Sequence, residues 1–152
     1  GTRLSHVKPH GALYNMAARD RALADAIAAA VCQFDPRLRL FGLSGSALVD
    51  AGAAQGLAVA AEAFADRRYR PDGTLQPRSE AGAVIDDAGL ATAQALQIAL
   101  DGTVTAIDGS TIAMRADTLC LHGDGVHAAR LARSLRAGLE AAGVTITATG
   151  EA

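Results

Sequence analysis

Aromatic residues are scarce in this sequence of 152 residues: Phe, Tyr and Trp together make up 3%, and Trp is absent. A core built around large rings is therefore excluded. The 50% of residues that are hydrophobic must supply the core through Ala, Leu, Val and Ile, in close contacts between helices and strands. A chain of this length buries one substantial core without disulfides or metals. We therefore expect residues 1–152 to form a single alanine-rich α/β domain.

The sequence also lacks a large excess of either charge sign and lacks long apolar runs. The 14 basic residues are scattered and nearly balanced by 16 acidic ones, for a formal net charge of -2. This leaves no basic patch for nucleic acid or for a membrane surface. No apolar stretch is long enough to cross a membrane, and no signal-peptide pattern opens the chain. We therefore expect a cytoplasmic protein that acts on a small molecule.

Cysteine and lysine are rarer still. Cys32 lies in a helical pattern and Cys120 in an apolar run, too few and too isolated for a disulfide framework or a metal knuckle. Both are expected to be buried thiols without a disulfide. Lys8 is the only lysine beside thirteen arginines. No phosphate loop of the type GxxxxGKS or GxxxxGKT is present, so a nucleotide would bind to another surface or to another subunit.

Predicted strands and helices alternate along the first half of the chain. Leu23, Ile27 and Val31 recur at every fourth position, which is typical of an amphipathic helix. The residues from Ser44 to Ser46 separate a strand from the next helix. The expected elements are strands at residues 4–7, 38–43 and 57–63 and helices at residues 12–33 and 47–55.

The second half continues the alternation after a long loop. Residues 64–82 are rich in charge, Pro and Gly, and loops of that length in compact domains are usually functional or mobile. Asp108-Gly109 predicts a hairpin. The remaining expected elements are a helix capped by Asp86 or Asp87 and running to about residue 100, hairpin strands at 103–107 and 111–114, a strand at 118–121, a helix carrying Leu131, Leu135 and Leu139, and a last strand at 144–147. This order predicts βα units around a mainly parallel sheet, either open or curled into a barrel.

Polar residues lie at the ends of four predicted strands. In parallel α/β folds ligands bind beyond the carboxyl ends of the strands, which makes these residues the natural candidates for a site. The four places are Lys8–His10, Ser44–Ser46, Glu62–Asp66 and His122–Asp124.

Three strings of this sequence resemble the LamB/YcsF family in order and approximate spacing: VKPHGALYN at Val7–Asn15, EAFADRRYRPDGTLQPRSEAGAVI at Glu62–Ile85, and ADTLCLHGD at Ala116–Asp124. The resemblance spans nearly the whole chain. It implies a (β/α) barrel-like fold of the glycoside hydrolase/deacetylase superfamily. It also implies a role as one subunit of an ATP-dependent 5-oxoprolinase, which hydrolyses the lactam 5-oxo-L-proline to L-glutamate together with two further subunits, B and C.

The family also has an N-terminal portion with acidic and histidine-containing motifs, to which this sequence has no match. We therefore expect the chain to be the C-terminal part of a family chain and to form an incomplete barrel. The resemblance implies ATP as a cosubstrate, together with Mg²⁺. No tightly bound metal is expected.

Five residues are candidates for catalysis. Lys8 carries a compact ammonium suited to a developing oxyanion or a phosphate, and the imidazoles of His10 and His122 can act as general acid or base. Glu62 ends an apolar strand, where a carboxylate is costly unless it is paired, so we expect a polar site or a buried partner such as an arginine. Asp124 belongs either to the site or, as an N-cap, to the following helix.

Further candidates would bind substrate or nucleotide: Tyr14, Asn15, Ser44, Asp66, Arg67, Arg78 and Ser79. The first helical turn after His10 offers backbone N–H groups to an anion, although Tyr14 is equally suited to packing. Arginines of the long loop can bind phosphate or carboxylate in a forked geometry, or they are ordinary solvated charges.

Two other functions stay open. His10, His122 and Asp124 would make a two-histidine, one-carboxylate metal set if their strand ends converge, as in a metal-dependent amide hydrolase or carbohydrate deacetylase. No HExxH or CxxC spacing supports such a set. Alternatively, the chain is a non-catalytic assembly module whose exposed edge pairs with another chain, a further copy of itself included.

Overall fold

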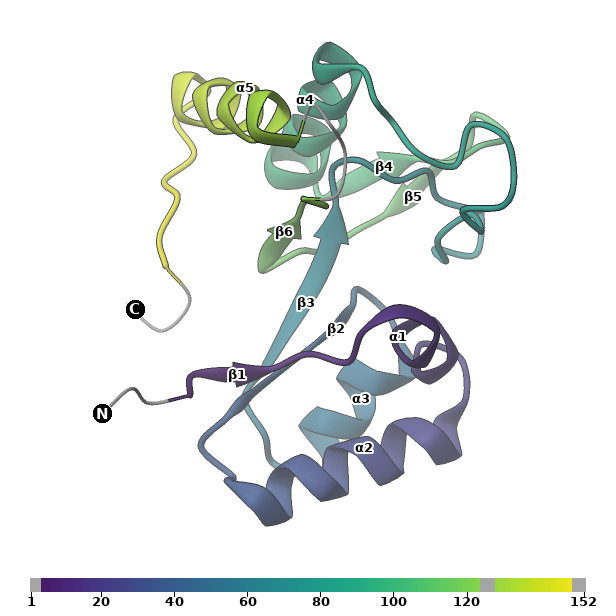
Figure 1. The fold of residues 1–152 in the computed structure, drawn as a ribbon, viewed down its shortest axis with the longest axis vertical. Coiled ribbons are helices and arrows are strands. Elements are labelled where there is room, and N and C mark those ends of the chain that lie inside the picture. The colour runs from purple at the N-terminus through teal and green to yellow at the C-terminus, as the bar shows by residue number, and fades with distance from the viewer. Residues whose placement is uncertain (1–3, 124–127, 149–152) are drawn as a thin grey trace. The chain divides into compact units, whose positions relative to one another are not determined.

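The computed structural model describes residues 4–123 and 128–148. These residues fall into two compact units, one that ends at Glu62 and one that begins at Ala63 (Figure 1). The four-stranded sheet has the strand order β1-β2-β3-β6, and β4 pairs with β5 in a separate two-stranded sheet. Strands and helices alternate along the chain, which confirms the predicted α/β class.

In the first unit, helices connect parallel strands. Its elements are β1 (His6–Val7), α1 (Gly11–Ala17), α2 (Arg21–Phe34), β2 (Arg39–Leu43), α3 (Ala47–Ala54) and most of β3 (Val59–Phe64). β1 pairs in parallel with β2, and β2 pairs in parallel with β3, with Leu43 opposite Glu62. The residues that follow β1 and β2 therefore emerge at the edge where Glu62 lies.

The prediction of one helix over residues 12–33 is wrong. α1 ends at Ala17, and α2 begins at Arg21 after Asp20, whose side chain accepts a hydrogen bond from the backbone N–H of Leu23. An aspartate that caps the first turn starts a new helix at this point. The core of this unit consists of small and aliphatic side chains from α2, β2 and α3, among them Ala24, Ala28, Leu40, Leu48 and Ala51.

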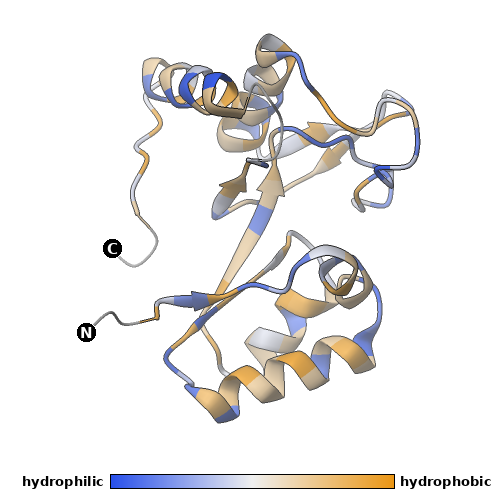
Figure 2. Cartoon of the chain, in the orientation of Figure 1, coloured by the Kyte–Doolittle hydropathy of each residue, from blue (hydrophilic) through white to orange (hydrophobic). Residues whose placement is uncertain are grey.

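The second unit contains the predicted hairpin and two packed helices. Its elements after β3 are α4 (Ala88–Leu96), the π-helical turn η1 (Gln97–Asp101), β4 (Thr103–Thr105), β5 (Thr111–Ala113), β6 (Thr118–Cys120) and α5 (Ala128–Ala141). Asp87 caps α4 through the N–H of Leu90, and β4 pairs antiparallel with β5. Both features confirm the sequence prediction. Figure 2 shows α5 banded with hydrophilic residues, while its buried positions are leucines that pack in a core with residues of α4: Leu131, Leu135 and Leu139.

Two sequence predictions fail in minor ways. Residues 144–147 do not form the expected strand. Val144 packs against the core between α4 and α5, but this segment pairs with none of the described strands, and β-rich composition gives a strand only where a neighbour completes the hydrogen-bond ladder. Cys32 and Cys120, expected to be buried, are half-buried thiols. Within the described residues, no helix has the length and apolar character needed to span a membrane.

Candidate functional site

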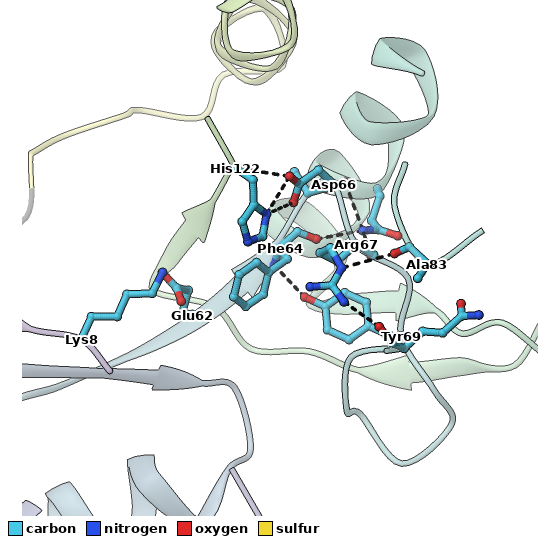
Figure 3. A network of polar contacts seen from close by, with 11 residues as sticks. Lys8, Glu62, Phe64, Asp66, Arg67, Tyr69, Ala83 and His122 are labelled. Carbon is cyan, nitrogen blue, oxygen red and sulfur yellow. Dashed lines mark hydrogen bonds and ion pairs between the residues drawn. The ribbon is translucent and has the colours of Figure 1, made fainter. Parts of the chain in front are cut away.

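The carboxylate of Glu62 is the centre of a buried polar cluster in the first unit. The Nζ atom of Lys8 donates to Oε1 at 2.7 Å, and the Oη atom of Tyr14 donates to Oε2 at 2.9 Å. The ammonium also lies 5.5 Å from the centre of the Tyr14 ring. We call Lys8, Tyr14 and Glu62 the Glu62 cluster. Figure 3 shows the Lys8 side chain reaching to the Glu62 carboxylate.

Three different elements place the members of the Glu62 cluster. Lys8 directly follows β1, Tyr14 lies on α1, and Glu62 lies in β3. The backbone N–H of Ser44, just after β2, donates to the Glu62 carbonyl at 2.9 Å. Only 3% of Glu62 is exposed, and a carboxylate that is this buried is costly unless both oxygens meet donors. The expected buried partner is present, but a lysine and a tyrosine provide it, not an arginine.

Two candidates close to Lys8 in the sequence lie outside this cluster. His10 is exposed and occupies the N-cap position of α1 without a capping hydrogen bond from its side chain. Asn15 is also exposed, and its amide donates to the Gly11 carbonyl at 3.1 Å. The structure therefore brings together Lys8, Tyr14 and Glu62, with Ser44 beside them through its backbone, and leaves the His10 imidazole accessible to solvent.

Asp66 and His122 form a second polar pair, which lies in the second unit. Asp66 is in the turn after β3, and His122 follows β6 by two residues. The backbone N–H of His122 donates to Oδ2 of Asp66 at 3.0 Å, and Nδ1 of the ring lies 2.8 Å from the same oxygen. The Phe64 ring stacks on the imidazole with ring centres 5.5 Å apart (Figure 3).

This geometry fixes the chemistry that His122 offers. A carboxylate only accepts hydrogen bonds, so the hydrogen of a neutral imidazole is assigned to Nδ1, and Nε2 becomes the acceptor nitrogen. The Asp66 side chain is 5% exposed, whereas that of His122 is 29% exposed. A buried carboxylate thus orients an imidazole that solvent can reach. An arrangement of this kind can take a proton from water and deliver it to a leaving group.

The long loop after β3 folds back on itself around Arg67. Its Nη2 donates to the Gln76 carbonyl at 2.6 Å, and its Nε donates to the Ala83 carbonyl at 3.3 Å. Burial lowers the pKa of the Arg67 guanidinium, and the positive charge of Arg78 lowers it further. These contacts favour a structural role for Arg67, while Arg78 and Ser79 are exposed on the same loop.

Sequence reasoning missed two buried polar side chains at the end of β3. The Gln94 amide, on α4, donates to three backbone carbonyls, and the Tyr69 hydroxyl accepts the N–H of Phe64. Neither residue belongs to a catalytic pattern. The one available signal was that Gln94 falls between Ala91 and Ile98 at helical spacing, on a face that is otherwise apolar.

Of the three proposed metal ligands, His10 and His122 lie within the described residues. Asp124 lies outside the described residues, so its expected role stays a prediction. In the part of the chain that the structure describes, no three side chains of His, Cys, Asp or Glu form a group that could hold a metal ion. The set of His10, His122 and Asp124 is therefore untested.

Comparison with known proteins identifies close relatives. The chain is 54% identical over 148 residues to a protein of Neisseria meningitidis serogroup C named as the A subunit of 5-oxoprolinase, a match that covers 97% of this chain and 60% of that protein. It is 59% identical over 150 residues to the protein of the same name from Methylococcus capsulatus, covering 99% and 58% of the two chains. The chain thus spans somewhat less than two thirds of the length of these curated relatives.

A solved structure and a family profile agree with these matches. The crystal structure of the lactam utilization protein from Thermus thermophilus superposes with a TM-score of 0.86 at 48% identity, covering 96% of this chain and 58% of that one. The profile of the LamB/YcsF family matches residues 1–152. Because that match includes every residue, the chain belongs to the LamB/YcsF family.

Proposed function

We propose that this chain is part of the A subunit of an ATP-hydrolysing 5-oxoprolinase, which converts 5-oxo-L-proline to L-glutamate. The Asp66–His122 pair carries the proposal, because it presents an oriented proton acceptor in a chain of this family. The name of the curated relatives supports 5-oxoproline as the substrate, and the name of the Thermus thermophilus protein supports a lactam.

The chemistry of the lactam explains the need for ATP and for a base. Amide resonance in the five-membered ring resists attack by water. In the proposed reaction the amide oxygen takes the γ-phosphoryl group and ADP leaves. Water then adds to the ring carbon, the carbon–nitrogen bond breaks as the nitrogen takes a proton, and the resulting acyl phosphate is hydrolysed to a carboxylate and phosphate. One water opens the lactam, and a second accounts for the hydrolysis of ATP.

His122 is the residue proposed to move protons in this sequence. Its Nε2 takes a proton from the attacking water and returns it to the ring nitrogen as that nitrogen leaves. Asp66 holds the required tautomer, and the stacked Phe64 ring limits rotation of the imidazole. A positioned general acid–base residue contributes roughly 10²- to 10⁴-fold to the rate.

The Glu62 cluster has a separate proposed role. The Lys8 ammonium has three N–H donors and can neutralise a developing oxyanion or a phosphate oxygen while one N–H stays on Glu62. Glu62 and Tyr14 would hold that ammonium in place. His10, with an exposed imidazole, remains a proposed acid–base residue.

ATP and two other subunits complete the proposal. ATP is the proposed cosubstrate, accompanied by Mg²⁺, which is held largely by phosphate oxygens and water when it travels with a nucleotide. The B and C subunits are the proposed partners. The names of the relatives, which designate one lettered subunit of 5-oxoprolinase, support a multi-subunit assembly.

The test uses the complete A subunit, assembled with its B and C partners, and measures glutamate and ADP formed from 5-oxoproline and ATP. We expect His122→Gln to assemble normally and to lower kcat by about 100-fold or more. His6→Gln is the matched control, because His6 is exposed, stacks on Phe41 and contacts Ser5; it should stay within about twofold of wild type. A wild-type complex that forms no glutamate, or a His122→Gln complex with normal turnover, would overturn the proposal.

A further inference from the structure

The last residue of β3 and the turn after it are held by side chains as well as by neighbouring backbone. Phe64 ends β3, and Ala65 and Asp66 form the turn. Strand backbone normally finds its hydrogen-bond partners in adjacent strands, and a buried backbone group that leaves the ladder needs another partner. Phe64, Ala65 and Asp66 are all buried, so the partners of their backbone groups decide how rigid this turn is.

The Gln94 side chain supplies two of those partners and also binds the carbonyl of the next residue, Arg67. Its Nε2 lies 2.9 Å from the carbonyl oxygen of Phe64, 3.2 Å from that of Ala65 and 2.9 Å from that of Arg67. An amide nitrogen carries two hydrogens, so at least one of them is shared between two carbonyls. Gln94 is 7% exposed, and an amide that is this buried is stable only where its donors are used.

The Tyr69 hydroxyl binds the other backbone polar group of Phe64, its N–H. Its Oη accepts the Phe64 N–H at 2.6 Å, and Tyr69 is completely buried. Side chains therefore bind both the N–H and the carbonyl of Phe64. Figure 3 shows Tyr69 and Phe64 linked in this way next to Asp66 and His122.

The turn that Gln94 and Tyr69 bind contains the residues that orient the His122 ring. Asp66 lies between two carbonyls that Gln94 binds, those of Ala65 and Arg67, and its own carboxylate binds both Nδ1 and the N–H of His122. Phe64, whose carbonyl is also bound, stacks on the imidazole. We infer that Gln94 is a positioning residue, which acts through Phe64 and Asp66 to fix the ring orientation and tautomer of His122.

Packing alone does not explain a glutamine at this position. The neighbouring buried residues of the same helical face are Ala91, Ala95 and Ile98, all apolar. An apolar residue at position 94 would continue that apolar face, but it would leave three carbonyls of a buried turn without this donor. The amide is therefore needed for the shape of the turn, and the turn carries Asp66.

This inference rests on the proposed function only for its effect on turnover, so the test has two readouts. The first is the pair of ring-nitrogen chemical shifts of His122 in the purified full-length A subunit, which report the tautomer without any substrate. The second is kcat and KM for 5-oxoproline in the assembled complex. The variants are Gln94→Glu, which keeps the shape but opposes a carboxylate to the three carbonyls, and Gln94→Met, which removes the donors.

We expect Gln94→Met to fold, to shift His122 away from a pure Nδ1–H tautomer, and to lower kcat by roughly 10- to 100-fold with little change in KM. Gln94→Glu should shift the tautomer in the same way at a larger cost in stability, because it sets a buried carboxylate against three carbonyls. Gln97→Met is the matched control, because Gln97 continues the same helix but bonds the side chains of Thr103 and Thr105; it should change neither readout. If Gln94→Met does not fold, Tyr69→Phe replaces it, with the same expected shift of tautomer.

Normal ring-nitrogen shifts in the folded Gln94 variants would overturn the inference, whatever the turnover. Altered shifts in a complex that does not hydrolyse 5-oxoproline would support Gln94 as a positioning residue and reject the proposed function. A loss of kcat with unaltered shifts would show that Gln94 does not act through His122, which also overturns the inference.

Discussion

The Nζ atom of Lys8 and the Oε1 atom of Glu62 lie 2.7 Å apart and join residues that are 54 positions apart in the chain. The side chain of Glu62 is 4% exposed and that of Lys8 is 18% exposed. Burial on this scale distinguishes the pair from a surface salt bridge, which contributes little because water screens both charges. Removal of one partner should therefore have a measurable cost, because it would leave the other charge buried without its counter-ion.

Removing the Lys8 charge should destabilise the protein. Lys8→Met leaves the Glu62 carboxylate with Tyr14 as its side-chain donor, and we expect a loss of about 2–3 kcal/mol, below the figure for a fully buried pair because Lys8 is partly exposed. Adding Glu62→Gln should recover most of this loss, since a neutral amide needs no cation. Urea unfolding of the two single variants and the double variant measures the coupling. Additive effects would show that the two charges do not stabilise each other.

A serine in place of His10 should stabilise the protein but lower its turnover. It occupies the N-cap of α1, where its imidazole makes no capping hydrogen bond, whereas serine at an N-cap stabilises a helix by roughly 0.5–1 kcal/mol. We expect His10→Ser to raise the free energy of unfolding by about 0.5 kcal/mol and to lower 5-oxoproline turnover of the complex at least about tenfold. If the variant keeps full turnover, His10 has no catalytic role.

Arg67 should stabilise the folded conformation of the long loop after β3. Arg67→Met leaves the Gln76 and Ala83 carbonyls without their guanidinium donors, at an expected cost of about 2–3 kcal/mol. Hydrogen exchange at residues 64–85 should rise accordingly. Arg70→Met is the control, because Arg70 forms an exposed pair with Glu80 and should cost less than about 1 kcal/mol. Equal exchange in the two variants would exclude this role for Arg67.

The pH dependence of the stability lost in Arg67→Met follows from the lowered pKa of Arg67. The pKa of Arg67 is lower in the folded protein than in the unfolded chain. At pH values between these two pKa values the unfolded chain binds more protons than the folded protein, and stability rises with pH there. Below both values the arginine is charged in both states, and its contribution is constant. The difference between wild type and Arg67→Met should therefore not change between about pH 6 and pH 9.

Gly138 should resist substitution by alanine despite its place in a helix. A Cβ at this position of α5 would collide with the Cγ2 methyl of Thr92 on α4, and the Thr92 hydroxyl is fixed by its 2.7 Å bond to the Ala88 carbonyl. We expect Gly138→Ala to cost about 1 kcal/mol net, because a clash of about 2 kcal/mol exceeds the gain in helix propensity of about 1. The comparison is made by urea unfolding.

The background variant Thr92→Ser tests the cause of that loss. Serine removes the methyl group and keeps the hydroxyl, so Gly138→Ala in this background should stabilise the protein by up to about 1 kcal/mol. The same loss in both backgrounds would mean that the contact between α4 and α5 is not what excludes alanine.

The sequence predicted elements best where local chemistry decides them. Asp108-Gly109 permits a tight turn, Asp87 caps α4, and the leucines of α5 recur at helical spacing, and all three features are present in the structure. The break between α1 and α2 was missed because alanine-rich sequence on both sides favours helix. The local signal of the break is Asp20, whose side chain caps the first turn of α2.

The site was less predictable because its contacts join distant parts of the chain. The need of Glu62 for a partner follows from burial, but the identity of that partner depends on how β1 and α1 meet β3. Asp66 was proposed as a ligand-binding residue, and nothing local reveals that its carboxylate binds His122, 56 positions away. Gln94 carried even less signal, because a helical glutamine is ordinary until the helix is packed against three carbonyls.

The pairing of Lys8 with Glu62 also gives the protein a built-in chemical reporter. Among these 152 residues Lys8 is the only side chain with a primary amine, so acylation of the folded chain by an amine-directed reagent modifies a single side chain. An ammonium held on a carboxylate reacts slowly, because the nucleophile is the neutral amine. The rate of labelling at Lys8, followed by mass spectrometry, therefore reads the fraction of time for which this ion pair is open, without any engineered probe.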